Sequence, residues 1–393
     1  MKINSIYIGG WFQRTMLQLS EVYDFLRNGE SQLKLNKKKL AELRKNLDMG
    51  SVEYGVAGEE FVMFTTAEHL RVKIFEDGLI VIGSENVSED TLFADVEHLK
   101  DYYEQKLSPA FNYIFSLGAP VPKELAHIEN IYPYFVVCDN ATREDIAELL
   151  SKTERQKYFE FDNKSYSVLR GDKYYFINNK KTSQPKIERY IEEQIFIREF
   201  KGQLHRYLNL HRIIWEKIDH VKDRAKVKGS DVIKFSTKLE SYAKTVTLID
   251  GRIRQMSTYI STRERIAKQD RELEEFLAIS GFRYETLRNT LEYIKYLWDM
   301  TKNYVQSAQK LFDGIKQDVT SSSIDSLTIV TSMSAGAAIL NLFTESEPTF
   351  TTFGFFYFFI LALVGWVATK LLSKVAEKRK YEISDVDIDT NIK

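Results

Sequence analysis

The spacing of apolar residues divides the chain into three regions. Up to about residue 180, short apolar and β-branched runs alternate with turn residues, a pattern that predicts strands. The expected strands cover 3–8, 60–66, 70–75, 79–82, 132–138, 157–161, 165–169 and 174–177, with turns at Asp77-Gly78 and Gly171-Asp172. Helices are expected over 88–117 and 142–150, the second begun by a capping box of Thr142 and Asp145. This succession of strands and helices predicts an α/β domain over residues 1–182. We expect this domain to be cytosolic, for the reasons of charge given below.

From residue 183 the apolar residues follow the period of long amphipathic helices. No proline lies between Lys186 and Asp318, and charged residues fill the positions between the apolar ones. Breaks at Lys228-Gly229-Ser230 and Ser280-Gly281 predict three helices, and the third is expected to run unbroken from Arg283 to Phe343. At 1.5 Å per residue this helix would be about 90 Å long. We expect a helical region over 183–282 and a stalk helix over 283–325.

Two uncharged stretches near the C-terminus, 326–344 and 348–369, are each about as long as a helix that crosses a bilayer. They predict a hairpin of two transmembrane helices, at 326–344 and 353–372, joined by an acidic loop at 345–352. Lysines and arginine follow the second stretch, so the positive-inside rule places the tail, 373–393, in the cytoplasm. With no signal peptide expected at the N-terminus, the sequence predicts a multi-pass protein of the inner or plasma membrane, in contact with lipids and with both termini cytoplasmic.

Steps of three and four residues along the third helix connect a stripe of mostly small and polar residues. The stripe consists of Asp318, Ser321, Asp325, Thr328, Ser332, Ala335 and Ile339. In a symmetric oligomer each residue would form a ring, so that carboxylates and hydroxyls would line a pore that favours cations. Alternatively, the small residues only let the first membrane helix pack closely against the second. The residues alone leave both interpretations open.

Composition narrows the possible functions. A net charge of −1 gives no reason to expect nucleic-acid binding. Cys138 is the single cysteine and is expected to be a buried apolar side chain. The carboxylate pairs Glu192-Glu193 and Glu274-Glu275 are expected on solvated helix surfaces. Because no nucleophile motif or metal-binding cluster accompanies them, the chain is not expected to be an enzyme or to carry a covalent cofactor.

The order of these parts resembles the CorA family of divalent-cation channels. That family has an α/β domain, a helical region, one long helix that enters the membrane, a short acidic loop, a second span and a basic tail. The resemblance covers the whole chain and is closest toward the C-terminus. It implies a homo-oligomer of five subunits shaped as a funnel, with the long helices lining the pore and Mg²⁺ or another divalent cation passing through it.

The chain departs from this family at its signature motif. In the family, Gly-Met-Asn ends the first span and forms the selectivity ring, whereas the sequence here reads Ile339-Leu340-Asn341-Leu342-Phe343. The resemblance therefore implies Asn341, Glu345 and Glu347 as the selectivity mouth. The missing Gly and Met leave the transported ion open.

CorA-like proteins without the full motif include a branch associated with type III CRISPR systems. There the channel is a membrane effector opened by a cytosolic nucleotide messenger, such as an S-adenosylmethionine–AMP conjugate. The many aromatic residues of the first region could stack on adenine, although most are expected in the core. Trp11 and Arg14, beyond a turn expected at Gly9-Gly10, are the candidate ligand-binding residues.

Three functions follow from this sequence. The first is a cation channel that its cytosolic domain gates, acting as an antiviral effector opened by an adenylate-type nucleotide. The second is a housekeeping transporter of Mg²⁺ or another divalent cation. The third is a scaffold that the hairpin only anchors to the membrane. Substituting Thr328 and Ser332 by leucine would block ion flux through a channel but would leave the function of a scaffold intact.

Overall fold

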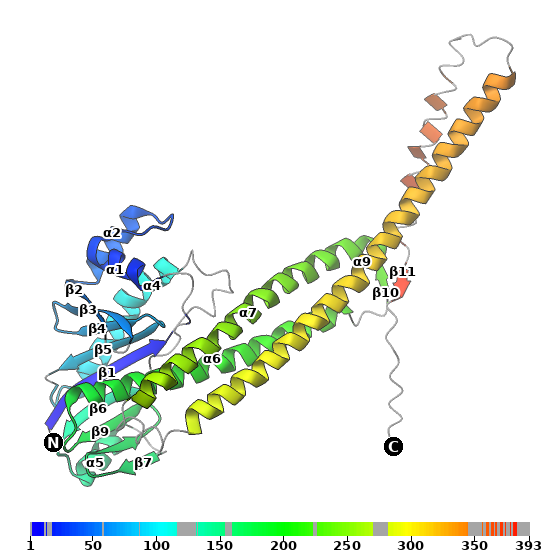
Figure 1. Ribbon diagram of the computed structural model, residues 1–393. Coiled ribbons are helices and arrows are strands. Elements are labelled where there is room, and N and C mark those ends of the chain that lie inside the picture. The colour runs from blue at the N-terminus through cyan, green and yellow to red at the C-terminus, as the bar shows by residue number, and fades with distance from the viewer. Residues whose placement is uncertain are drawn as a thin grey trace, which may run out of the picture. The chain divides into compact units, whose positions relative to one another are not determined.

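A computed structural model describes most of the chain up to residue 344 and single positions beyond it (Figure 1). The described residues are 2–11, 13, 18–56, 59–85, 87–115, 131, 133–153, 159–222, 226–269, 282–344, 356, 359, 360, 363, 364, 366, 367, 370, 371, 374, 378 and 380–382. The chain divides into two compact units. Unit 1 is made of Met1–Leu208 and Leu248–Lys295, and unit 2 of Asn209–Thr247 and Tyr296–Lys393.

Unit 1 is built on a nine-stranded sheet with the order β2-β3-β4-β5-β1-β6-β9-β8-β7. The strands are β1 (Lys2–Trp11), β2 (Met49–Val56), β3 (Glu60–Thr66), β4 (Arg71–Phe75), β5 (Leu79–Glu85), β6 (Tyr134–Asp139), β7 (Phe159–Asp162), β8 (Tyr166–Arg170) and β9 (Tyr174–Asn179). Neighbouring strands are antiparallel except β6 and β9, which are parallel. The sheet is therefore mixed, as an α/β domain with hairpins requires.

Five α-helices accompany these strands in the described part of the first 182 residues. They are α1 (Leu19–Asn28), α2 (Lys37–Asn46), α3 (Leu92–Asp101), α4 (Ser108–Phe115) and α5 (Arg143–Thr153), and a π-helical turn, η1 (Tyr102–Leu107), joins α3 to α4. Alternate residues of a strand point to opposite faces of the sheet. On β1, Ile6 and Ile8 join the apolar core that contains residues of α1 and α3, whereas Trp11 on the other face contacts Phe196 and Tyr259.

Three long helices follow the sheet: α6 (Gln184–Lys222), α7 (Gly229–Gln269) and α9 (Phe282–Thr344). Each contributes residues to both units. The predicted break at 228–230 is confirmed by the start of α7, and the third helix is unbroken over 63 residues, one residue longer than predicted at each end. In unit 2, α6 and α9 are joined by stacked Trp215 and Tyr304 rings, 4.4 Å between centroids, and β10 (Lys226–Lys228) pairs with β11 (Lys380–Glu382).

Local sequence signals account for most of these boundaries. The capping box at α5 is confirmed: Thr142 N–H donates to Asp145 Oδ2 at 3.0 Å, and Asp145 N–H donates to Thr142 Oγ1 at 3.1 Å. The first of these bonds, which the backbone N–H of Thr142 donates to the carboxylate, holds the pKa of Asp145 below its usual value. Helices α1 and α2 and strand β2 were not predicted, and the helix expected from residue 88 begins at Leu92. The turn expected at Gly9-Gly10 is wrong, because β1 continues through both glycines to Trp11.

Candidate functional sites

The stripe predicted to line a pore lies on α9. Asp318, Ser321, Thr328, Ser332 and Ala335 are all exposed. The hydroxyl of Thr328 donates to the carbonyl of Ile324 in its own helix, at 2.9 Å. Asp325, Ile339 and Asn341 belong to the helix by backbone, but their side chains lie outside the described residues. Glu345 and Glu347 lie outside them altogether.

The described positions beyond α9 are rich in exposed apolar side chains. Eight large apolar residues are exposed there: Phe356, Phe359, Ile360, Leu363, Val364, Trp366, Val367 and Leu371. All eight have helical backbone and follow one another in steps of one to four residues. Over the described residues, however, none of the helices combines the length and the apolar character that crossing a bilayer requires. The two predicted spans stay predictions.

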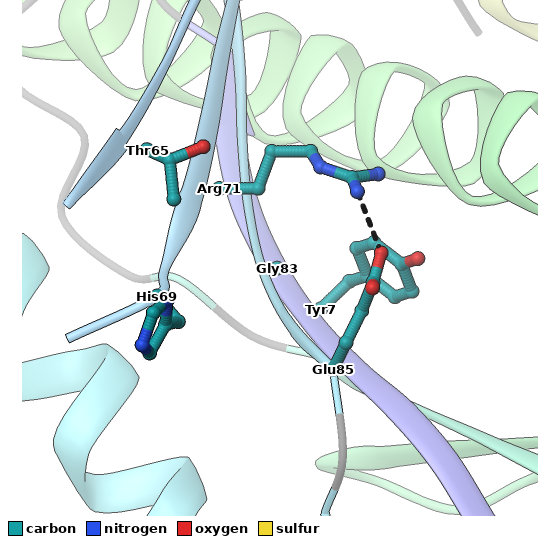
Figure 2. A pocket seen from close by; sticks show the side chains of 6 residues that line it. All are labelled: Tyr7, Thr65, His69, Arg71, Gly83 and Glu85. Carbon is teal, nitrogen blue, oxygen red and sulfur yellow. Dashed lines mark ion pairs between the residues drawn. The ribbon is translucent and has the colours of Figure 1, made fainter. Parts of the chain in front are cut away.

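A second candidate site is a hollow of about 320 Å³ on the sheet of unit 1, shown in Figure 2. It is lined by residues of β1, β3, β4, β5 and the β3–β4 turn: Tyr7, Thr65, His69, Arg71, Gly83 and Glu85. The strand register explains why they meet, since Thr65 is opposite Arg71, Arg71 opposite Gly83 and Gly83 opposite Tyr7. These four positions form one row across the sheet, on the face that contacts α6.

Arg71 is the charged centre of this hollow. Its Nη2 pairs with Glu85 Oε1 at 2.7 Å, and its Nη1 lies 3.4 Å from Glu188 Oε1 on α6. Tyr7 donates its hydroxyl to the same Glu188 oxygen at 3.1 Å and accepts a hydrogen bond from Gln184 at 2.9 Å. Burial, followed by the Glu188 charge, raises the pKa of Tyr7, which keeps its hydroxyl protonated.

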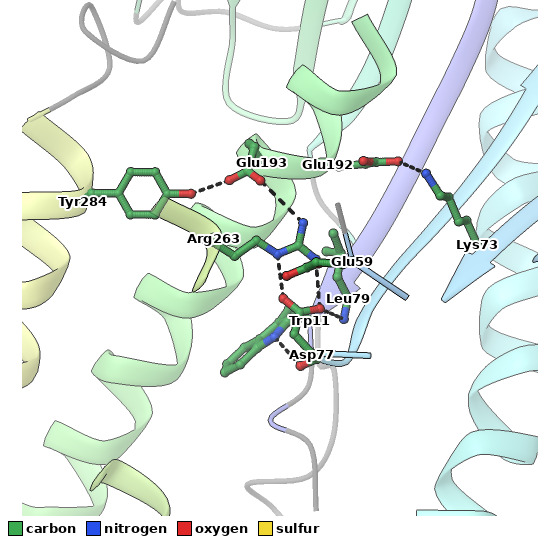
Figure 3. A network of polar contacts seen from close by, with 9 residues as sticks. All are labelled: Trp11, Glu59, Lys73, Asp77, Leu79, Glu192, Glu193, Arg263 and Tyr284. Carbon is green, nitrogen blue, oxygen red and sulfur yellow. Dashed lines mark hydrogen bonds and ion pairs between the residues drawn. The ribbon is translucent and has the colours of Figure 1, made fainter. Parts of the chain in front are cut away.

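A third candidate is a buried network around Arg263 of α7, shown in Figure 3. The guanidinium binds Asp77 through two hydrogen bonds, Nε to Oδ2 at 2.6 Å and Nη2 to Oδ1 at 2.9 Å. Its Nη1 donates to Glu193 Oε1 at 3.5 Å. Glu59 Oε2 lies 2.6 Å from Nη2 without accepting an aligned hydrogen bond, so this contact is an ion pair alone. One cation thus faces three carboxyl groups.

The network joins the sheet to the start of α9. The hydroxyl of Tyr284, in the first turn of α9, donates a short hydrogen bond to Glu193 Oε2. The neighbouring Glu192 pairs with Lys73 of β4 at 2.7 Å. Because α6 carries both glutamates, it is tied on one side to the sheet and on the other to α9. All these groups belong to unit 1.

The excess of carboxyl groups raises their proton affinity. Burial, followed by the charge of Asp77, raises the pKa of Glu59 from 4.5 to about 8, against the opposing effect of Arg263. Burial also raises the pKa of Glu193 and Glu192. Since a buried carboxylate without a full set of partners is costly, the network favours protonation of its glutamates, and Glu59 binds a proton more readily than an ordinary carboxyl group.

The structure bears on several residues that the sequence analysis singled out. Glu192 and Glu193 were expected on a solvated surface, and this is wrong: Glu193 is 1% exposed and Glu192 7%. Trp11, the candidate for ligand stacking, is 3% exposed and its Nε1–H donates to the carbonyl of Asp77 at 2.9 Å. It has the environment of a core residue, and a ligand role for it stays a prediction. Arg14 and the pair Glu274-Glu275 lie outside the described residues. Cys138 is buried, as predicted.

Sequence reasoning missed Arg263, although a signal was present. In α7 the buried residues Ile253, Met256, Ile260 and Ala267 follow one another in steps of three, four and seven residues. Arg263 occupies the remaining position of that series. An arginine on an otherwise apolar helix face is typical of a buried ion pair. The hollow around Arg71 had no such signal, because its residues come from four separate strands and a turn.

Comparison with known proteins yields little. No protein-family model matches the chain, and no curated protein matches it. Among solved structures, it is similar to the CorA magnesium transporter from Methanocaldococcus jannaschii, with 10% sequence identity and a TM-score of 0.26. The match covers 63% of this chain and 91% of that one. A TM-score this low does not place two chains in one fold.

Proposed function

We propose that the chain assembles as a homo-oligomer in a membrane and conducts cations through a pore lined by the stripe of α9. The observation that carries the proposal is the exposure of the stripe. Five stripe residues whose side chains are described, from Asp318 to Ala335, are exposed on one helix of 63 residues. Polar residues at this spacing keep one face of a helix turned toward a common axis when copies surround it.

The chemistry of the stripe suits cations. Asp318 and Asp325 would form carboxylate rings at one mouth, which concentrate cations before they enter. Thr328 and Ser332 would form hydroxyl rings whose oxygens replace part of an ion's hydration shell. Ala335 adds a small side chain that leaves the axis open. The exposed apolar residues from Phe356 to Leu371 support contact with lipid, because surfaces of this kind are rare on protein facing water.

In this proposal, unit 1 controls the opening of the pore. The network of Arg263 ties α6 to the first turn of α9, so a change in unit 1 that moves α6 would act directly on the helix that lines the pore. The most specific form of the proposal is a pentameric channel opened by an adenylate-type nucleotide, acting in type III CRISPR defence. Its support is the sequence resemblance to the CorA family and the loss of Gly-Met-Asn.

Ion flux tests the proposal. Purified full-length protein is placed in liposomes, and the flux of Mg²⁺, Na⁺ and K⁺ is compared before and after adding candidate adenylate messengers. The test variant is Thr328→Leu with Ser332→Leu, which places apolar bulk in two rings. The matched control is Val330→Leu, which changes a residue about 200° around the helix from Ser332.

The proposal expects flux in the wild-type protein and in the control, and at least a tenfold loss in the double variant. Flux that appears only with a nucleotide supports the gated effector. Constitutive Mg²⁺ flux supports the housekeeping transporter instead. No cation flux under any condition overturns the channel and leaves the membrane-anchored scaffold.

A further inference from the structure

The hollow around Arg71 contains hydrogen-bond donors that the protein's own side chains leave unused. Within the described residues, the Thr65 hydroxyl and the His69 imidazole have no hydrogen-bond partner. Arg71 has five N–H groups and uses only two atoms in its contacts with Glu85 and Glu188. Glu85 supplies the charged acceptor among the lining side chains, while the hydroxyls and a neutral imidazole can accept as well as donate. Because the unused N–H groups of Arg71 can only donate, a molecule that binds them would contribute acceptors.

The ion pair at the mouth of the hollow can be exchanged. The side chains of Arg71 and Glu85 are 42% and 51% exposed. Ion pairs this exposed contribute roughly 0–1 kcal/mol to stability, so an incoming anion loses little by displacing the carboxylate. A guanidinium binds oxyanions through two parallel N–H groups, which makes Arg71 the natural anchor for such a group. Glu85 would then occupy the site only in the absence of a ligand.

The Tyr7 ring lies against Gly83 and forms part of the lining of the hollow (Figure 2). A Cβ added to Gly83 would lie 2.6 Å from this ring, so glycine at this position lets the tyrosine pack directly on the strand. At the rim, His69 has a left-handed backbone, φ 62°, which is uncommon for a residue other than glycine. The turn thus holds the imidazole at the edge of the hollow.

We propose that this hollow is a binding site for a small molecule that carries a phosphate-type oxyanion, with Arg71 as the anchor and His69 and Thr65 as further donors. A volume of about 320 Å³ is at the lower end of the range for small-molecule sites. It accommodates an oxyanion with a compact organic part.

Occupancy would reach α6 through Glu188. Arg71 contacts Glu188, and Tyr7 donates to the same oxygen. A ligand that draws Arg71 away would weaken the hold on α6 one turn before Glu192 and Glu193, which enter the Arg263 network. The site would then be an effector site for the channel, a consequence that rests on the proposed function. Binding itself does not depend on it.

Isothermal titration calorimetry on the purified full-length protein tests the site, with inorganic phosphate, AMP and adenosine as probes. Two variants have opposite expected effects. Arg71→Gln removes the anchor and should weaken phosphate binding at least tenfold. Glu85→Gln removes the competing carboxylate and should strengthen binding several-fold. Arg143→Gln is the control, because Arg143 forms one exposed ion pair, with Glu160, away from the hollow.

The three probes distinguish a site that recognises the oxyanion alone from a site that also recognises the organic part of the ligand. Binding of phosphate and AMP alike indicates that the oxyanion is sufficient, and binding of AMP alone indicates that the organic part is recognised too. Circular dichroism confirms that each variant is folded. The proposal is overturned if adenosine binds as well as AMP, if no phosphate or AMP binds to wild type or to Glu85→Gln, or if Glu85→Gln weakens binding. Binding in a protein without ion flux would refute the channel and leave the site standing.

Discussion

The two ends of helix α9 are built on opposite principles. Its first turn is fixed by its own chain: Tyr284 is buried, and its hydroxyl is bonded to a glutamate that a buried arginine also contacts. The stripe from Asp318 to Ala335 is exposed, with polar and small side chains on one face. One end thus obtains its order from the fold of unit 1, whereas the other has a surface suited to copies of the same chain. A helix that is fixed to unit 1 at one end and exposes a surface for other copies of the chain at the other is suited to transmit a movement from unit 1 to the stripe.

The largest expected effect comes from a substitution that disrupts the buried network at the start of α9. Arg263→Met leaves three carboxyl groups without their cation, so the free energy of unfolding should fall by about 3–5 kcal/mol, as when one partner of a buried pair is removed. Urea unfolding of the purified protein measures the change. Arg212→Met is the control, since Arg212 is exposed and its contact with Glu216 is a long one, 3.9 Å. Equal effects of the two substitutions would contradict the role of Arg263.

The proton of the network gives the next prediction. The pKa of Glu59 is about 8 in the folded protein against 4.5 for the ordinary group, so between these values the folded state holds a proton that the unfolded state has lost. The stability from this group is complete below about pH 4.5 and declines by up to about 1.4 kcal/mol per pH unit until about pH 8. Glu59→Gln should flatten this decline in urea unfolding measured from pH 5 to 9. Parallel curves for both proteins would show that Glu59 does not hold the proton.

A smaller change tests the link to α9. Tyr284→Phe removes the hydroxyl that donates to Glu193 and should destabilise the protein by about 1–3 kcal/mol, since a buried acceptor loses its donor. Hydrogen exchange should also rise in the first turns of α9. The matched control on the same helix is Tyr293→Phe, where the tyrosine is exposed and the change should stay within about 0.5 kcal/mol. If Tyr293→Phe proves as destabilising as Tyr284→Phe, the buried bond is not what orders this end.

The smallest expected effect on stability belongs to the stripe. Ser332→Leu replaces an exposed side chain, so the free energy of unfolding of the monomer should change by less than about 0.5 kcal/mol. The same substitution should strongly reduce ion flux. A loss of stability as large as that of Tyr284→Phe would show that Ser332 packs within its own chain and would remove the contrast between the two ends.

Patterns of local sequence were sufficient to predict the long helices and most strands. The helical period ran without proline through α9, and turn residues marked the hairpins at Gly78 and Gly171. Helices α1 and α2 were missed because they are short, and α2 has a single buried residue, Leu40, to signal its face. The buried glutamates of α6 were missed because two adjacent charges resemble a solvated surface. Their partners, Lys73 and Arg263, are distant in sequence.

The accessibility of single cysteines along α9 tests the central claim most directly. Cys138, the native cysteine, is buried, so the thiol reagent is not expected to change the flux of the wild-type protein. Ser332→Cys and Val330→Cys are compared in liposomes by treatment with a positively charged thiol reagent during ion flux. The account predicts that modification blocks flux at position 332 and leaves it unchanged at position 330. Equal sensitivity of the two positions, or block at 330 alone, would contradict a pore lined by the stripe.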